Sequence, residues 1–344
     1  MERRFRVGIA DGFFGPDGKP TWGDIGLHLL EQDPRMDWAL YAPTRVEVRP
    51  EDLSGFDGVV ALGERYTRES FVGIDRLLAI GRFGVGYDRI DVQACTEADV
   101  ALFVTPSGVR RPVASSALAL ILSLSMKMPQ KALYSRTGEH DRVNEQIGIG
   151  LIGRTLGSIG VGNIGRELFR LAAPLEMRFL ASDPYASQGD LDSLGVRLVP
   201  FDALLAESDI LCLNCPLTSE TRHIVDAASL ARMKPSAILV NTARGELVDT
   251  DALVEALASG RIAGAGLDVT DPEPLPVGHP LLRMDNVIVT SHRLCFTDQL
   301  VQGIGYADME GMRALARGEA PSAVVNRDVL GRPGFRAKLD CWRG

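Results

Sequence analysis

The stretch from Thr155 to Asp183 constrains the fold of this chain more than any other segment. A short apolar run at 156–159 precedes GVGNIG at 160–165, which has the pattern G-x-G-x-x-G. Apolar residues then recur at spacings of three and four through 164–172, which is typical of a helix. A second apolar run, 177–181, ends shortly before Asp183. The segment therefore predicts a strand, a tight turn, a helix and a second strand.

Each part of this segment favours binding of a dinucleotide. Gly160 permits the strand-to-helix turn, Gly162 lets a pyrophosphate approach the backbone, and Gly165 lets helix and strand pack closely. The helix N-terminus presents free N–H groups and a partial positive charge to the phosphates. Asp183 is placed to accept hydrogen bonds from ribose hydroxyls and would repel a 2′-phosphate, so we expect NAD rather than NADP. The alternative is an ordinary strand-to-helix turn, because Gly-rich turns are common.

Composition limits the class of protein. A chain of 344 residues with 45% hydrophobic content can form two globular domains. A net charge of −8 and a pI near 5.3 argue against nucleic acid or an anionic membrane as the main partner. The five cysteines are odd in number and scattered, and the C-x-x-C formed by Cys212 and Cys215 lies inside an apolar strand pattern. Free thiols are therefore expected here, with no metal site.

The sequence predicts a cytoplasmic protein without a membrane span. The charged N-terminal stretch lacks the apolar region of a signal peptide, and 5–10 is typical of a first strand. The most apolar segment, 113–126, is short for a span and is interrupted by serines. We expect a buried helix there, beginning with Pro112 in its first turn and running to about Met128, where Pro129 limits it.

Short apolar runs alternate with helical patterns along most of the chain, which predicts an α/β protein with mostly parallel sheets. The loop at 11–22 contains Phe13 and Phe14 and is placed to reach a pocket, and 137–150 is expected to be a polar loop. A last helix, 298–316, is expected to return to the first domain. The expected strands are 6–10, 38–41, 58–62, 77–81, 196–199, 209–215, 237–241, 264–269 and 286–291, with helices at 202–207, 226–233 and 250–259.

Three charged or titratable residues follow strands of the second half of the chain. Arg244, Glu273 and His292 come after the runs that end at 241, 269 and 291. Ligands of open parallel sheets bind at the carboxyl ends of the strands, where the Gly-rich turn also lies.

These three residue types suit hydride transfer at a 2-hydroxy or 2-keto acid. Arg244 can hold a carboxylate or polarise a carbonyl. His292 can exchange a proton with the carbonyl or hydroxyl oxygen, and Glu273 can orient the ring and stabilise the imidazolium. The alternative is that each of the three is an ordinary surface or structural residue.

A second G-x-G, Gly84-Val85-Gly86, follows the fourth apolar run. It lacks the third glycine and the apolar helix start of a dinucleotide site. Its exposed backbone amides could hold a carboxylate. A plain turn explains the spacing equally well.

Several motifs resemble the D-isomer-specific 2-hydroxyacid dehydrogenase family, over most of the chain and most densely from 150 to 292. They are GVGNIG with Asp183, GRFGVGYDRID at 81–91, PLTSETRHIVD at 216–226, NTARGELVDTDALVEALASGRIAGAGLDV at 241–269, EP at 273–274, HPLL at 279–282 and the segment around His292. The resemblance implies two Rossmann-like α/β domains and a homodimer. A flavodoxin-like substrate domain would be built from 1–110 plus 297–344, and a NAD-binding domain from 111–296.

The resemblance also implies the roles of individual residues. Arg244, Glu273 and His292 would be catalytic. Val85 and Gly86 would bind the substrate carboxylate through backbone amides, together with Arg244 and His292. Contacts with NAD are implied for Gly160, Gly162, Asn163, Ile164, Gly165, Asp183, Cys215, Pro216, Thr221, Thr242, Ala243 and Asp268.

Three departures from the family pattern bear on the substrate. Val113-Ala114-Ser115 stands where the family commonly has Val-Ala-Glu, bulkier residues at 293–296 follow His292, and the 11–22 loop is longer than typical. We hypothesise that Arg293 or the loop with Phe13 and Phe14 shapes the pocket, the alternative being that Arg293 points to solvent. Two other functions stay open. One is a NAD(H)-sensing protein like the family's transcriptional corepressors, and the other is a dehydrogenase of another small anion such as formate or phosphite.

Overall fold

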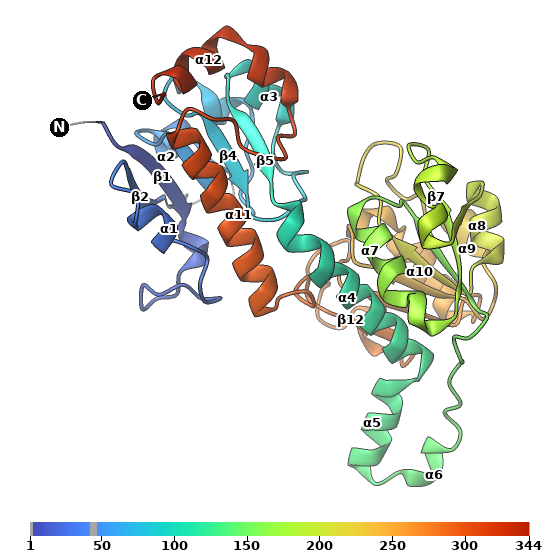
Figure 1. Cartoon of the computed structure of the whole chain (residues 1–344). Coiled ribbons are helices and arrows are strands. Elements are labelled where there is room, and N and C mark those ends of the chain that lie inside the picture. The colour runs from blue at the N-terminus through green and yellow to red at the C-terminus, as the bar shows by residue number, and fades with distance from the viewer. Residues whose placement is uncertain (1–2, 42–46, 344) are drawn as a thin grey trace. The chain divides into compact units, whose positions relative to one another are not determined.

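The computed structural model describes residues 3–41 and 47–343. The chain divides into two compact units, the first comprising Met1–Val109 with Phe296–Gly344 and the second Arg110–Cys295. Each unit is built around one parallel sheet, and the two are described separately below (Figure 1).

The first unit contains a five-stranded parallel sheet. Its strands are β1 (Phe5–Ala10), β2 (Met36–Tyr41), β3 (Gly58–Ala61), β4 (Ala79–Arg82) and β5 (Ala101–Val104), in the order β2-β1-β3-β4-β5. The fifth strand was not predicted from the sequence. The helices are α1 (His28–Glu31), α2 (Pro50–Leu53), α3 (Val92–Glu97), α11 (Asp298–Ala316) and α12 (Pro333–Asp340).

The chain returns to this first unit through α11. The helix packs on β4: a Cβ on Gly81 would lie 2.8 Å from the Asp308 carboxylate and 3.2 Å from Met312. Asn326, further along, accepts a hydrogen bond from the Leu102 amide and so fastens the returning segment to β5. The predicted return of the 298–316 helix is therefore observed.

The second unit contains a seven-stranded parallel sheet with the order β12-β11-β10-β9-β6-β7-β8. The order reverses between β6 and β9, so the sheet is doubly wound. The strands are β6 (Thr155–Ile159), β7 (Arg178–Ser182), β8 (Val196–Leu198), β9 (Ile210–Leu213), β10 (Ile238–Asn241), β11 (Gly264–Leu267) and β12 (Val287–Val289).

Helices cover both faces of this sheet, which explains why its strands are continuous apolar runs. One core packs α4 (Pro106–Ser125) and α7 (Asn163–Ala172) against the sheet, and the other packs α8 (Phe201–Glu207), α9 (Ala227–Arg232) and α10 (Thr250–Ala258). The predicted class, two doubly wound α/β domains of which one is assembled from both ends of the chain, is confirmed.

The prediction for the apolar helix was wrong at both ends. The helix α4 begins at Pro106 and has Pro112 in its interior, because its first turn packs closely on α11: a Cβ on Gly108 would lie 2.4 Å from the Ile304 nitrogen. It ends at Ser125, and Pro129 opens the next helix, α5 (Met128–Thr137), since proline is compatible with a first turn. The segment predicted as a polar loop, 137–150, also contains the short helix α6 (His140–Val143).

The aromatic residues of the 11–22 loop serve packing. Phe13 is 1% exposed, and its ring packs edge-on against Trp22 and Phe83 at centroid distances of 5.7 and 4.8 Å. Phe14 stacks on Trp38. Phe13 therefore packs inside the loop, and the hypothesis that this loop or Arg293 shapes the substrate pocket stays a prediction.

Within the described ranges no single helix has the length and apolar content to cross a bilayer, and one bent pair, α4 with α5, meets those two criteria only in combination.

Candidate active site

The Gly-rich loop of the second unit joins β6 to α7 with the geometry that its glycines require. Gly160 has φ +84°, and a Cβ there would lie 2.8 Å from the Cys215 nitrogen. A Cβ on Gly165 would lie 2.9 Å from the Gly160 carbonyl oxygen, so the helix packs tightly on the turn. Nothing lies within 4 Å of the Cβ position of Gly162. The middle glycine therefore faces open space, as approach of a pyrophosphate requires.

The amides at the start of α7 are directed out of the helix. The first intrahelical hydrogen bond runs from the Arg166 amide to the Gly162 carbonyl, 3.0 Å. The preceding amides, of Asn163, Ile164 and Gly165, are those that an α-helix leaves without intrahelical acceptors. Together with the helix dipole they form an anion-binding end. These groups fit the phosphates of a dinucleotide.

Asp183 follows β7 directly and braces the Gly-rich loop. One carboxylate oxygen accepts the Val161 amide at 2.9 Å, and the other accepts the Tyr185 amide at 2.9 Å. Each oxygen keeps acceptor capacity, since a carboxylate has about four lone-pair sites. The side chain is half-buried beside the loop, where a ribose diol would be recognised.

Two further loops border this edge of the sheet. After β9, the Thr221 hydroxyl donates to the Pro216 carbonyl at 2.7 Å and closes the 216–221 loop on itself. Burial raises the pKa of the neighbouring Cys215 thiol to about 11, and the nearby Asp183 charge adds to the effect. Cys215 is thus a neutral thiol lining the loop. The other cysteine of the pair, Cys212, is buried, and both are free.

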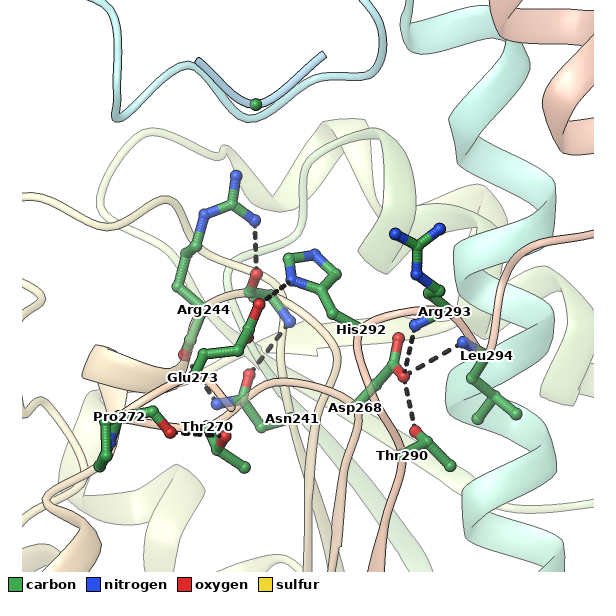
Figure 2. Close-up of polar contacts among 12 residues, drawn as sticks. Asn241, Arg244, Asp268, Thr270, Pro272, Glu273, Thr290, His292, Arg293 and Leu294 are labelled. Atoms are coloured by element: carbon green, nitrogen blue, oxygen red, sulfur yellow. Dashed lines mark hydrogen bonds and ion pairs between the residues drawn. The ribbon is translucent and has the colours of Figure 1, made fainter. Parts of the chain in front are cut away.

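The loop after β10 carries Thr242, Ala243 and Arg244. Asn241, 1% exposed, accepts the Ala243 amide at 3.0 Å and donates to the Arg244 carbonyl at 2.7 Å, which fixes the turn. Figure 2 shows the Arg244 side chain extending from this turn, and its Nη1 donates to the Ala243 carbonyl at 2.7 Å. The next residue must be glycine, because a Cβ on Gly245 would lie 2.1 Å from the Thr270 carbonyl.

Glu273 and His292 form a direct pair. The Nδ1 atom of His292 lies 2.8 Å from Oε1 of Glu273, and both side chains are about two-fifths exposed, at 43% and 42% (Figure 2). Burial raises the pKa of Glu273, but the hydrogen bond and charge of His292 outweigh it, with smaller contributions from the Thr270 amide and Arg244. The pKa of Glu273 is therefore lowered from its ordinary value of 4.5. Glu273 is an anion at neutral pH.

Asp268, at the end of β11, lies beneath the turn that carries His292 and is 3% exposed. Its Oδ1 accepts the Thr290 hydroxyl at 2.5 Å and the amides of Arg293 and Leu294 at 3.2 and 3.1 Å (Figure 2). Its carbonyl accepts the His292 amide at 2.7 Å. The Arg293 side chain is exposed and extends to the same side as His292 in Figure 2.

Val85 and Gly86 lie in the first unit, in the loop after β4. Gly84 has φ +123° and its amide donates to the Thr105 hydroxyl at 3.0 Å, which sets the direction of the loop. Within residues 3–41 and 47–343, the amides of Val85 and Gly86 donate to no protein acceptor. Two adjacent amides without acceptors fit the prediction of a carboxylate-binding turn.

The sequence did not single out Thr290 or Asn241. Asn241 ends β10 and Thr290 directly follows β12, so the available signal was a polar residue at the carboxyl end of an apolar run. In the same described residues, no group of three or more His, Cys, Asp or Glu side chains is arranged to hold a metal ion.

A doubly wound sheet with a Gly-rich turn and an acid after its second strand defines a dinucleotide-binding α/β protein. Residues 118–293 match the family model described as "D-isomer specific 2-hydroxyacid dehydrogenase, NAD binding domain". The chain belongs to this family, whose members bind NAD and act as dehydrogenases of 2-hydroxy acids.

Individual relatives extend the match over nearly the whole chain. A glyoxylate reductase of Korarchaeum cryptofilum is 36% identical over 320 residues, covering 90% of this chain and 96% of the relative. A D-3-phosphoglycerate dehydrogenase of Methanocaldococcus jannaschii is 39% identical over 269 residues, covering 78% of this chain but 51% of the relative. Among solved structures, a glyoxylate reductase from Paecilomyes thermophila superposes with a TM-score of 0.81 at 28% identity, covering 95% of this chain and 100% of that one.

Proposed function

We propose that this protein catalyses reversible hydride transfer between NAD(H) and a D-2-hydroxy acid or its 2-keto acid, with His292 as the acid–base group. The observation that carries the proposal is the contact of 2.8 Å between His292 Nδ1 and Glu273 Oε1. This pair lies at the carboxyl edge of the sheet that also carries the Gly-rich turn. Family membership supports the same reaction class.

The pairing assigns different work to the two ring nitrogens of His292. Because Nδ1 is engaged by Glu273, Nε2 is the atom available to the substrate. During reduction the imidazolium donates its Nε2 proton to the carbonyl oxygen, and during oxidation the neutral ring accepts the hydroxyl proton. Glu273, an anion at neutral pH, stabilises the imidazolium and orients the ring.

Arg244 is proposed to bind the substrate. Its planar guanidinium can make two parallel hydrogen bonds to a carboxylate and withdraw charge from the adjacent carbonyl. In the first unit, the amides of Val85 and Gly86 are proposed as binding groups for a substrate carboxylate, for which their unused donors are suited.

The groups that would hold NAD lie at the carboxyl edge of the sheet of the second unit. Amides at 162–165 would bind the pyrophosphate, and Asp183 the adenosine ribose. Side chains and backbone of the bordering loops complete the proposed set, namely Cys215, Pro216, Thr221, Thr242, Ala243 and Asp268. When bound, the nicotinamide supplies the hydride acceptor or donor. A carboxylate at Asp183 favours NAD over NADP because it repels a 2′-phosphate.

The two units would divide the work. We propose 111–296 as the NAD-binding domain and 1–110 plus 297–344 as the substrate domain. The support is the position of each predicted group, since the Gly-rich turn lies in one unit and the Val85–Gly86 turn in the other.

Small 2-keto acids are the proposed substrates, with glyoxylate first. The support is that relatives named glyoxylate reductase match this chain over nearly their full length. Oxidation of NADH would be followed with glyoxylate, hydroxypyruvate and bulkier keto acids, using wild type and His292→Gln. Turnover that is lost in His292→Gln supports the proposal. Absence of turnover with every keto acid would contradict the proposal. NADH binding without turnover would then indicate a NAD(H)-sensing protein, and oxidation of formate or phosphite would indicate a dehydrogenase of another small anion.

A homodimer is proposed through the arm formed by residues 126–152, which includes α5 and α6 (Figure 1). Of the eleven large hydrophobic side chains exposed in the described chain, five lie on this arm. A second copy would cover them. They are Met126, Met128, Leu133, Ile147 and Ile152. Light scattering on wild type and an Ile147→Asp, Ile152→Asp variant tests this, and a monomeric wild type would refute it.

A further inference from the structure

The turn that carries His292 has a backbone conformation that needs support. His292 has φ +56°, in the left-handed region that residues with a Cβ adopt at a cost. Its amide donates to the Asp268 carbonyl at 2.7 Å. The direction of the imidazole depends on this backbone, because χ1 starts from it. Whatever holds the turn therefore also sets the direction of the ring.

Three donors converge on one oxygen of the buried Asp268 carboxylate. Two are the amides of Arg293 and Leu294, which follow His292, and the third is the Thr290 hydroxyl, which precedes it. The hydroxyl contact is the shortest of the three, at 2.5 Å against 3.1 and 3.2 Å. The carboxylate thus links both sides of the His292 position (Figure 2).

We propose that Thr290 is a positioning residue that acts through Asp268 to hold His292 in its catalytic orientation. The inference rests on the proposed function, since it takes His292 as the acid–base group. The two amides belong to the backbone and remain in every side-chain variant, whereas the hydroxyl is removed by a single substitution. Without it, the carboxylate loses its shortest contact in a buried site, where replacement by water is restricted. The carboxylate can then rotate, and the left-handed turn relaxes.

Thr290→Val tests this geometry without changing any charge near the ring. Among the described residues of the second unit, the charged groups around His292 include Glu273 at Nδ1, Arg244, which acts on Glu273, the Asp268 carboxylate below, and Arg293 next in sequence. All are retained in Thr290→Val, and valine has nearly the shape of threonine. A change in the pH–rate profile of this variant therefore reports the position of the ring and not the loss of a charge.

The experiment compares wild type, Thr290→Val and Thr290→Ser, with Thr155→Val as the matched control. Thr155 is 2% exposed and begins β6, at the opposite end of the same sheet. We expect Thr290→Val to lower kcat on the order of 10- to 100-fold, the size of effect that a displacement of about 1 Å produces.

Two further readouts separate positioning from loss of stability. The pH–rate profile of Thr290→Val should differ from that of wild type. The kcat of Thr290→Ser should stay within roughly threefold of the wild-type value, since serine keeps the hydroxyl. The ¹⁵N NMR signals of the His292 ring should move in Thr290→Val and not in Thr290→Ser or Thr155→Val.

The outcomes separate this inference from the proposed function. The inference about Thr290 would be overturned if Thr290→Val kept the kcat and the pH profile of wild type. It would also be overturned if Thr290→Ser were as slow as Thr290→Val, or if Thr155→Val lost as much kcat as Thr290→Val. If wild type turns over no 2-keto acid, the proposed function fails, and the NMR comparison then decides the role of Thr290. His292 ring signals that stay unchanged in Thr290→Val would overturn the inference about Thr290, and shifted signals would support it.

Discussion

Replacement of Glu273 by glutamine tests the electrostatic half of the proposed site. Glutamine has the same shape and can still accept the Nδ1–H of His292, so the ring keeps its position. What disappears is the negative charge 2.8 Å from Nδ1. The carboxylate stabilises only the protonated ring, so its loss selectively disfavours the imidazolium.

The distance and exposure set the size of the effect. Two unit charges at 2.8 Å attract by about 1.5 kcal/mol in water and by about 6 kcal/mol at an effective dielectric constant of 20. Both side chains are about two-fifths exposed, at 43% and 42%, so the water value applies and the larger figure is discounted. A loss of about 1 to 1.5 kcal/mol corresponds to a fall in rate of roughly 5- to 10-fold.

The assay is kcat for reduction of the 2-keto acid at neutral pH. Reduction uses the protonated ring as the acid, so weaker stabilisation of the imidazolium slows it. In Glu273→Gln kcat should therefore fall roughly 5- to 10-fold. The control is Glu255→Gln, which removes an exposed carboxylate from α10 and should leave kcat unchanged.

A kcat of Glu273→Gln equal to that of wild type would refute the reasoning, and so would a higher kcat. A loss far beyond tenfold would mean that Glu273 chiefly orients the ring.

Three further predictions concern the cofactor loop and the stability of the fold. Gly160→Ala should lower the free energy of unfolding by about 2 kcal/mol or more, because of φ +84° and a Cβ 2.8 Å from the Cys215 nitrogen. At Gly162 nothing lies within 4 Å of the Cβ position, so Gly162→Ala should change the free energy of unfolding by less than about 1 kcal/mol. The added methyl should nevertheless weaken NADH binding. Urea unfolding measures the stability of both variants, and titration with NADH measures their binding. Asp183→Ala should reduce the preference for NADH over NADPH at least roughly tenfold in kcat/KM, since charged hydrogen bonds to the ribose are lost; an unchanged ratio would contradict the assignment. The side-chain hydrogen bond from Arg35 lowers the pKa of Asp33 to about 2, so Asp33 stabilises the fold above its ordinary pKa of 3.8 and loses that contribution as pH falls toward 2. Asp33→Asn should therefore be less stable than wild type at pH 7, by up to about 2 kcal/mol, and the difference should vanish near pH 2; a difference that persists there would contradict it.

Much of the candidate site could be read from the sequence because strand ends are short-range features. Arg244 follows an apolar run directly, and topology alone brings the carboxyl ends of parallel strands to one edge. The hydrogen bond between Glu273 and His292 fits this pattern, although nineteen residues separate the two. Asp183 was likewise predicted from its position after the second strand.

Other features could not be read from the sequence, since they depend on contacts between distant segments. Pro112 suggested a helix start, but the packing of Gly108 on α11 extended the helix upstream of it. Phe13 suggested a ligand-facing aromatic side chain, and its burial against Trp22 and Phe83 gave it a packing role.

The sequence by itself determined the class of fold and the cofactor loop of this protein. Both follow from local rules: apolar periodicity selects strand or helix, and a glycine is required wherever the backbone turns with positive φ or a neighbour approaches too closely for a Cβ. Only the tertiary structure decided how His292 is held, because Thr290 becomes significant through its distance to Asp268, twenty-two residues earlier in the chain. A hydroxyl at the end of a strand carries no sign of its partner until the sheet brings the two strands together.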